Sequence, residues 1–152
     1  MRHALAVAGT IALSLLGGPL SAQDAGLVVR ESALSVKDTL DKLTKVLDEK
    51  GIKVAARVDH AAGAKAAGME LPPTEVVFFG NPKLGTPLMQ SNPQIALDLP
   101  MRVAAWTDKA GKTWVAYTSV DALKARYGIK DKDEAFKAMA GALDAFTGAA
   151  TK

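Results

Sequence analysis

The stretch from Phe79 to Met89, FGNPKLGTPLM, holds the residues best suited to binding a small ligand. Asn81 followed by Pro82 is typical of a helix start, because asparagine caps free amides and proline lacks the donor that would be unpaired there. The three amides that follow Pro82 would then point outward beside the charge of Lys83. We expect this geometry to receive a carboxylate, sulfate or phosphate group.

A rigid turn without a ligand is the alternative explanation for the same residues. Gly80 and Gly85 would then supply unusual dihedral angles, and the two prolines would supply stiffness. The stretch lacks the final Lys-Ser or Lys-Thr pair of a P-loop, so nucleotide hydrolysis is unsupported.

His60 is the second candidate, and it follows Asp59 at the start of a predicted short helix. The positive end of a helix dipole disfavours the charged imidazolium, so a neutral imidazole could act as a base or as a ligand for metal or haem. Asp59 or Glu75 could complete a partial metal site, although the spacing matches no known motif. A surface or interface histidine hydrogen-bonded to Asp59 or to backbone is the alternative.

We expect the ligand-binding residues to form one pocket. Its members are His60, Asn81, Lys83, Gly85, Thr86 and Met89. The sequence identifies no catalytic residue, no metal-binding set and no cofactor. Ser119 and Thr86 have no histidine partner recognisable by motif, so a hydrolase triad is unsupported. The methionines are scattered, which favours core packing over soft-metal binding.

The N-terminus has the layout of a secretory signal peptide. Arg2 and His3 precede an apolar run from Ala4 to Leu16, and we expect cleavage after Ala22. The run is too short to span a bilayer comfortably. Residues 23–152 would then form a single periplasmic or secreted domain, with no membrane association after cleavage.

Composition narrows the class of partner. The formal net charge is +3, and basic residues alternate with acidic ones, so we expect no nucleic-acid binding. The chain has no cysteine, which excludes thiol catalysis and iron–sulfur clusters. His60 is the one histidine left after signal cleavage, so one chain cannot build a site from several histidines.

Hydrophobic periodicity predicts the elements that must position these residues. Strands are expected over residues 26–31, 52–58, 76–79, 99–107 and 112–118. Helices are expected from Ser35 to Gly51, over 61–68, from Ser119 to Gly128, and from Asp131 onward, with residues 148–152 frayed. The strand at residues 76–79 is apolar throughout and is predicted to be central. Trp106 and Trp114 are expected to pair across the hairpin.

This order predicts an α+β fold. We expect a two-layer sandwich, with a mixed or antiparallel sheet of about five strands and helices mainly on one face.

Five segments in this order resemble the family known as domain of unknown function 302. They are residues 58–64, 71–74, 79–89, 95–100 and 114–117, and the Gly-Asn-Pro…Gly-Thr-Pro-Leu-Met block is the most specific. The resemblance implies a compact α/β fold and a tendency to dimerise, but no established activity. Many members carry Arg-His where this chain has Arg126-Tyr127, which weakens any scheme that needs a second histidine.

These observations favour a module that binds or senses a small ligand or anion. A structural or interaction homodimer is the alternative, using a sheet edge or the alanine-rich helix. A metal-assisted enzyme built around His60 is the second alternative.

Overall fold

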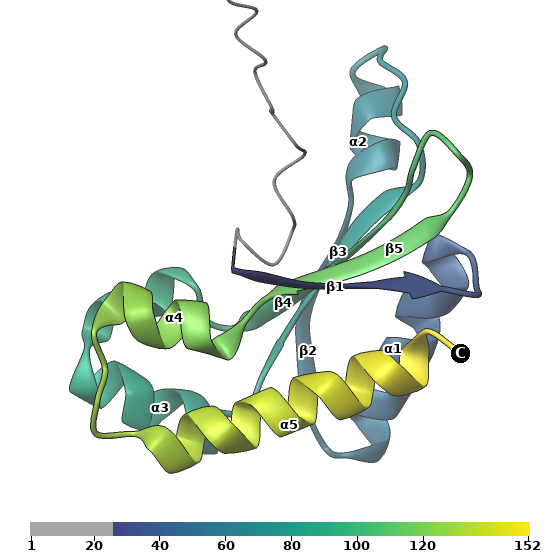
Figure 1. Ribbon diagram of the computed structural model, residues 1–152. Helices are drawn as coiled ribbons and strands as arrows, with labels where there is room; N and C mark the ends of the chain where they lie inside the picture. Colours follow the sequence, from purple (N-terminus) through teal and green to yellow (C-terminus); the bar gives the residue numbers. More distant parts are fainter. Residues whose placement is uncertain (1–25) are drawn as a thin grey trace, which may run out of the picture.

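A computed structural model describes residues 26–152, which form five strands and five α-helices (Figure 1). The strands are β1 (Leu27–Ser32), β2 (Lys53–Asp59), β3 (Thr74–Gly80), β4 (Met101–Thr107) and β5 (Thr113–Thr118). The helices are α1 (Val36–Glu49), α2 (His60–Ala66), α3 (Pro82–Ser91), α4 (Val120–Tyr127) and α5 (Asp133–Ala150), with a 3-10 turn η1 (Pro93–Leu97). The predicted signal peptide, residues 1–22, lies outside these residues.

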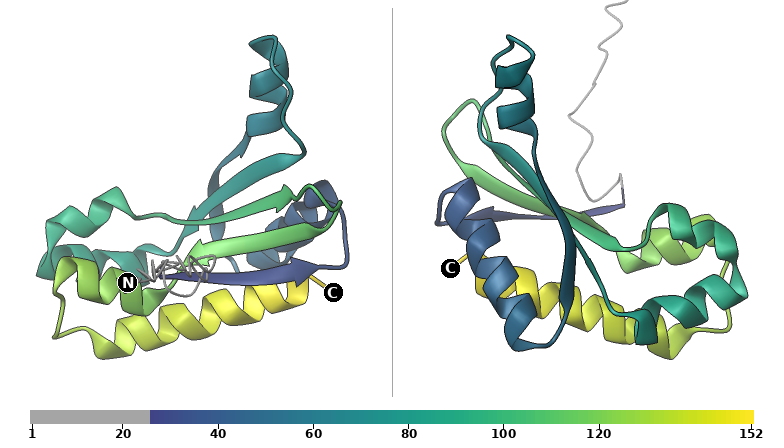
Figure 2. Two further views of the ribbon diagram at one scale, coloured as in Figure 1. Left: turned by 45° about the horizontal axis from the view of Figure 1, so that its top comes forward. Right: turned by 180° about the vertical axis from the view of Figure 1, so that it is seen from behind.

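The five strands form one antiparallel sheet in the order β1-β5-β4-β3-β2. Helices α1 and α5 cover one face of this sheet, whereas α3 and α4 lie at one end and α2 projects from the other (Figures 1 and 2). The predicted α+β architecture, with helices mainly on one face, is therefore confirmed.

The strand order corrects one prediction. β4 is the middle strand, and β3 is an interior strand between β4 and the edge strand β2. The apolar run in β3 is explained by Val77 and Phe79, which enter the core under the helices, and by Val76, which is buried on the other face. An apolar sequence alone cannot distinguish the middle strand from its neighbour, because both are paired on two sides.

Local capping signals place the helix ends as predicted. Ser35 accepts a hydrogen bond from the amide of Asp38 at 3.1 Å, and Gly51 follows α1 in the left-handed conformation with φ of +66°. Ser119 caps α4 in the same way, and Gly128 ends that helix with φ of +61°. Trp106 and Trp114 pair across the β4–β5 hairpin, as predicted.

Helix α5 departs from prediction at both ends. It begins at Asp133, because Asp131 instead accepts a hydrogen bond from the Ser91 hydroxyl at 2.6 Å. It does not fray at residue 148 but continues to Ala150, and the Thr151 carbonyl accepts a bond from the Ala33 amide at 3.0 Å. The tail is held by a distant segment, which local sequence does not reveal.

Deleting residues 150–152 should therefore destabilise the fold by about 1 to 2 kcal/mol, since it removes a buried methyl group and the acceptor for Ala33. Urea unfolding followed by circular dichroism measures the change. Lys152→Ala removes only an exposed side chain and should stay within about 0.5 kcal/mol of the parent. Equal stability of the deletion and the parent would show that the tail contributes nothing.

Candidate functional site

A cavity of about 680 Å³ opens where α3 and α5 meet the ends of β2 and β3. It lies partly beneath the stretch that the sequence singled out. Four of the six predicted site residues line it: Asn81, Gly85, Thr86 and Met89. Their role in binding stays a prediction, but the structure does bring them to one hollow.

His60 does not reach this cavity. It starts α2, which follows the far end of β2, whereas the cavity is lined by the first residues of that strand. The seven residues of β2 separate the two places by about 20 Å at the usual strand rise. The expectation that His60 and the Asn81 turn share one pocket is therefore wrong.

The carboxylates proposed to assist His60 have other partners. Asp59 accepts a hydrogen bond from the Ala62 amide at 2.8 Å and caps α2, as predicted. Glu75 accepts from Arg57 at 2.7 Å. Within residues 26–152, no group of three His, Cys, Asp or Glu side chains is placed to hold a metal ion.

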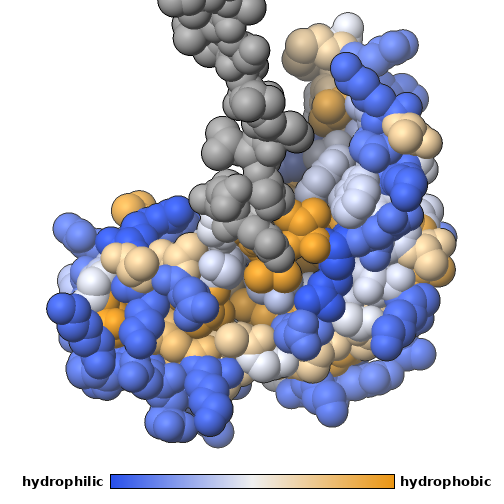
Figure 3. Space-filling view, in the orientation of Figure 1, coloured by the Kyte–Doolittle hydropathy of each residue, from blue (hydrophilic) through white to orange (hydrophobic). Residues whose placement is uncertain are grey.

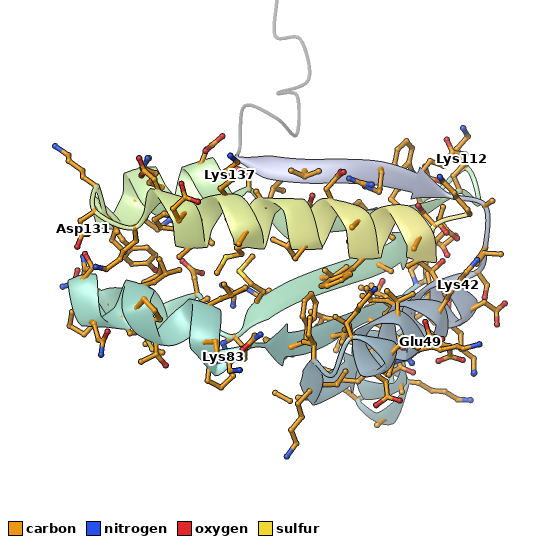
Figure 4. The ribbon with its side chains drawn as sticks, turned by 90° about the horizontal axis from the view of Figure 1, so that it is seen from below. Lys42, Glu49, Lys83, Lys112, Asp131 and Lys137 are labelled. Carbon is orange, nitrogen blue, oxygen red and sulfur yellow. The ribbon has the colours of Figure 1, made fainter. Side chains whose placement is uncertain are left out.

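Lys83 lies outside the cavity lining, at the start of α3 and beside the strand ends (Figure 4). The amides around it are not free. The backbone amide of Lys83 donates to the Asn81 side-chain oxygen at 2.9 Å, and the amides of Leu84 and Gly85 donate to the Asn81 carbonyl at 2.9 and 3.0 Å. The predicted helix cap is confirmed, but it leaves none of these three amides for an anion.

The two glycines of this stretch do not need unusual dihedral angles, since neither has a positive φ. Gly80 lies in a tight place, because a Cβ there would lie 3.2 Å from the Cβ of Pro100 and would need Pro100 to move by a few tenths of an ångström. At Gly85 a Cβ would meet Leu99 at 3.6 Å, an ordinary contact. The turn is therefore shaped by packing at Gly80, and Gly85 has room for a methyl group.

The cavity walls are mainly apolar. Helix α5 contributes Met139, Ala142, Leu143 and Phe146, and the strands and the residues just before β2 and β4 contribute Ile52, Val54, Phe79, Leu99 and Met101. Lys53 is the one charged residue in the lining. Cavities of this size with apolar walls and few polar groups are typical of small-molecule sites.

A second cluster of chemically active side chains surrounds Asp98, which sequence reasoning missed. Asp98 is only 7% exposed and accepts bonds from Arg126 at 2.7 Å, from the Tyr127 hydroxyl at 2.6 Å, and from Arg102. Burial alone would raise the pKa of Asp98, but the bonds from Tyr127 and Arg126 and the two positive charges lower it overall.

The Asp98 cluster ties η1 to α4 and β4. Its one sequence signal is an acidic residue between Leu97 and Leu99 in an otherwise apolar segment. Tyr127, the position that departs from the Arg-His pattern, supplies a hydroxyl donor here. The same bond raises the pKa of Tyr127.

An apolar stripe crosses the sheet face that α1 and α5 leave open. Adjacent strands align its members in register: Val29, Ala116, Ala104, Val76 and Val58. Hydrophobic residues gather near the centre of this region in the space-filling view, between α2 and α4 (Figure 3). Within residues 26–152, no helix packs on this face.

This architecture defines a class: a two-layer α+β domain with one covered sheet face and an apolar cavity at the sheet end. The family model for the domain of unknown function DUF302 matches residues 28–146, and the chain belongs to this family. A crystal structure of an uncharacterized conserved DUF302 protein from Bacillus stearothermophilus has a similar fold, with a TM-score of 0.66 and 15% identity. The alignment covers 83% of this chain and 95% of that chain.

Some relatives carry a functional name. Proteins named fluoride-specific ion channel FluC 1 from Brucella suis and Brucella abortus are each 46% identical to this chain over 117 residues. The match covers 76% of this chain but only 46% and 43% of those proteins. The chain thus spans less than half of each relative, and the channel name describes those longer proteins. Every helix within residues 26–152 is too short or too polar to cross a membrane.

Asp98→Asn should lower the free energy of unfolding by about 1 to 3 kcal/mol near neutral pH, because charge-assisted hydrogen bonds are lost. A lowered folded pKa means that the carboxylate stabilises the fold fully above its ordinary pKa of 3.8. This contribution disappears as the pH falls through the lower folded value. The difference between the two proteins should therefore stay constant from about pH 5 to 8 and shrink in acid.

Chemical denaturation across this pH range measures the difference. Asp48→Asn, at an exposed position on α1, is the matched control and should change stability by no more than about 0.5 kcal/mol. A difference between Asp98→Asn and the parent that grows in acid would contradict the ion-pair role.

Proposed function

We propose that this domain is an exported module that binds or senses a small, largely apolar molecule in the cavity beside α3 and α5. One observation carries this proposal: the cavity of about 680 Å³, whose lining has one charged residue among apolar and uncharged ones. Its volume lies within the usual range for small-molecule sites. Burying an apolar ligand surface there would contribute roughly 25 cal/mol for each Å² removed from water.

A small inorganic anion is a poorer match for the same walls. The amides at the start of α3 already have acceptors, so an anion there would gain no backbone donor. Apolar side chains offer no compensation for its lost hydration. Fluoride, the ion in the relatives' names, is therefore not the ligand that we propose.

Helix α3 is the wall best suited to adjust when a ligand enters. It contains Gly85 and Pro87, and both residue types lower intrinsic helix stability. Pro87 also has no amide hydrogen to donate to the carbonyl of Lys83. We expect this helix to shift more readily than the long helix α5 on the other side of the cavity.

Ala142→Phe tests the cavity, because the larger side chain would occupy space that the ligand needs. A neutral fluorescent probe such as N-phenylnaphthylamine should bind the parent protein with increased emission. The variant should bind it about tenfold more weakly, equivalent to about 1.4 kcal/mol. Sodium fluoride should not displace the probe.

Ala145→Phe is the matched control, since Ala145 lies on the same helix but is exposed and does not line the cavity. It should bind the probe as the parent does. Equal loss in both variants, or no binding to the parent, would remove support for a ligand site here.

We also propose that the chain forms a homodimer, with a second copy seated on the open sheet face. The observation that favours this is the apolar stripe from Val29 to Val58, which crosses all five strands. A two-fold axis through the face would bring each copy's stripe against the other, as an isologous interface requires. The family resemblance implies the same tendency.

Ala104→Glu should convert the dimer to a monomer, because a charge at the centre of the stripe would be buried without a partner. Native mass spectrometry at micromolar concentration reports the mass directly. Ala110→Glu, in the exposed turn of the β4–β5 hairpin, is the control and should remain dimeric. A monomeric parent protein would refute this interface.

A further inference from the structure

We infer that the ligand of the cavity is a single-chain amphiphile with one anionic head, such as a fatty-acid carboxylate, whose head is held at the rim by Lys53 and Lys83. This inference rests on the proposed function and adds the chemistry of the ligand. It follows from the contrast between the walls and the rim of one cavity.

The apolar walls of the cavity favour a ligand with a hydrocarbon chain. Side chains from α5 form one side, with Met139, Leu143 and Phe146, and Phe79 and Met101 contribute from the sheet. No aspartate or glutamate belongs to the lining, and its uncharged polar residues are Asn81 and Thr86. A ligand with polar groups along its whole length would leave them unpaired among these side chains.

The rim carries two cations at the same end of the sheet. Lys53 is paired with Gly80 in the β2–β3 register, and Lys83 follows Gly80 by three residues at the start of α3. Both lysines are exposed. Across residues 26–152, neither takes part in an ion pair. Lys53 thus lines the apolar hollow and Lys83 lies just outside its lining, and both carry an ammonium group without an acidic partner among these residues.

The position of Lys53 sets where the head lies. Lys53 lines the cavity and is also exposed, so it lies where the hollow meets solvent. The flexible stem of Lys53 therefore keeps its ammonium in water at the rim, as long basic side chains commonly do. The ligand would place its head in solvent contact and its tail inside.

This arrangement selects against other amphiphiles. A cationic head would be repelled by both lysines, and a neutral head would gain nothing from them. Because the charges are exposed, the preference for an anionic head should be moderate and should weaken with added salt.

Dodecanoate and dodecanol test this inference, since they share one chain and differ in the charge of the head. Displacement of the neutral fluorescent probe reports the affinity of each. The parent protein should bind dodecanoate about threefold to tenfold more tightly than dodecanol at low salt. In Lys53→Gln/Lys83→Gln this preference should vanish, while dodecanol binds as it does to the parent.

Lys45→Gln/Lys109→Gln is the matched control, because it removes the same charge at exposed positions away from the cavity. It should retain the preference for dodecanoate. Equal binding of both compounds by the parent, or a preference that survives the rim substitutions, would overturn the anionic head but leave the apolar site. Failure of both compounds to bind would instead refute the proposed function.

Discussion

Packing of helix α5 across the sheet is the interaction on which most of the structure depends. Its apolar stripe, Phe136, Met139, Leu143 and Phe146, is buried, and three of these side chains also line the cavity. Figure 4 shows α5 running across the covered face, with α3 beside its first half and α1 beside its second half. One helix therefore closes the core and forms a wall of the candidate site, so a change in its position would alter both.

Sequence reasoning succeeded where the determining contacts are local. Helix caps act over two or three residues. The predicted hydrogen bond from a backbone amide to the capping side chain is present at Ser35, Asp59, Asn81 and Ser119. Alternation and turn residues likewise predicted the β4–β5 hairpin. The fold class followed, because the order of elements restricts the layers that they can form.

The features that the sequence did not predict depend on contacts between distant segments of the chain. The donors to Asp98 include Arg126 and Tyr127, which are 28 and 29 residues away, so the acidic residue in its apolar segment does not by itself identify its partners. The hydrogen bond between Ala33 and Thr151 joins residues that are still further apart in the sequence, and it holds the tail that was predicted to fray. His60 and Asn81 each follow a strand, but antiparallel pairing sends those two strand ends to opposite ends of the sheet.

Gly85 supplies an argument for function that the cavity alone does not. The residue lies inside α3, has no positive φ, and leaves room for a Cβ at 3.6 Å from Leu99. Alanine would therefore fit and would favour the helix by about 1 kcal/mol. Pro87 is a second residue in the same helix that lowers helical stability. Local choices that oppose stability tend to occur at functional sites. Gly85 lines the apolar cavity, and Pro87 lies in the same helix.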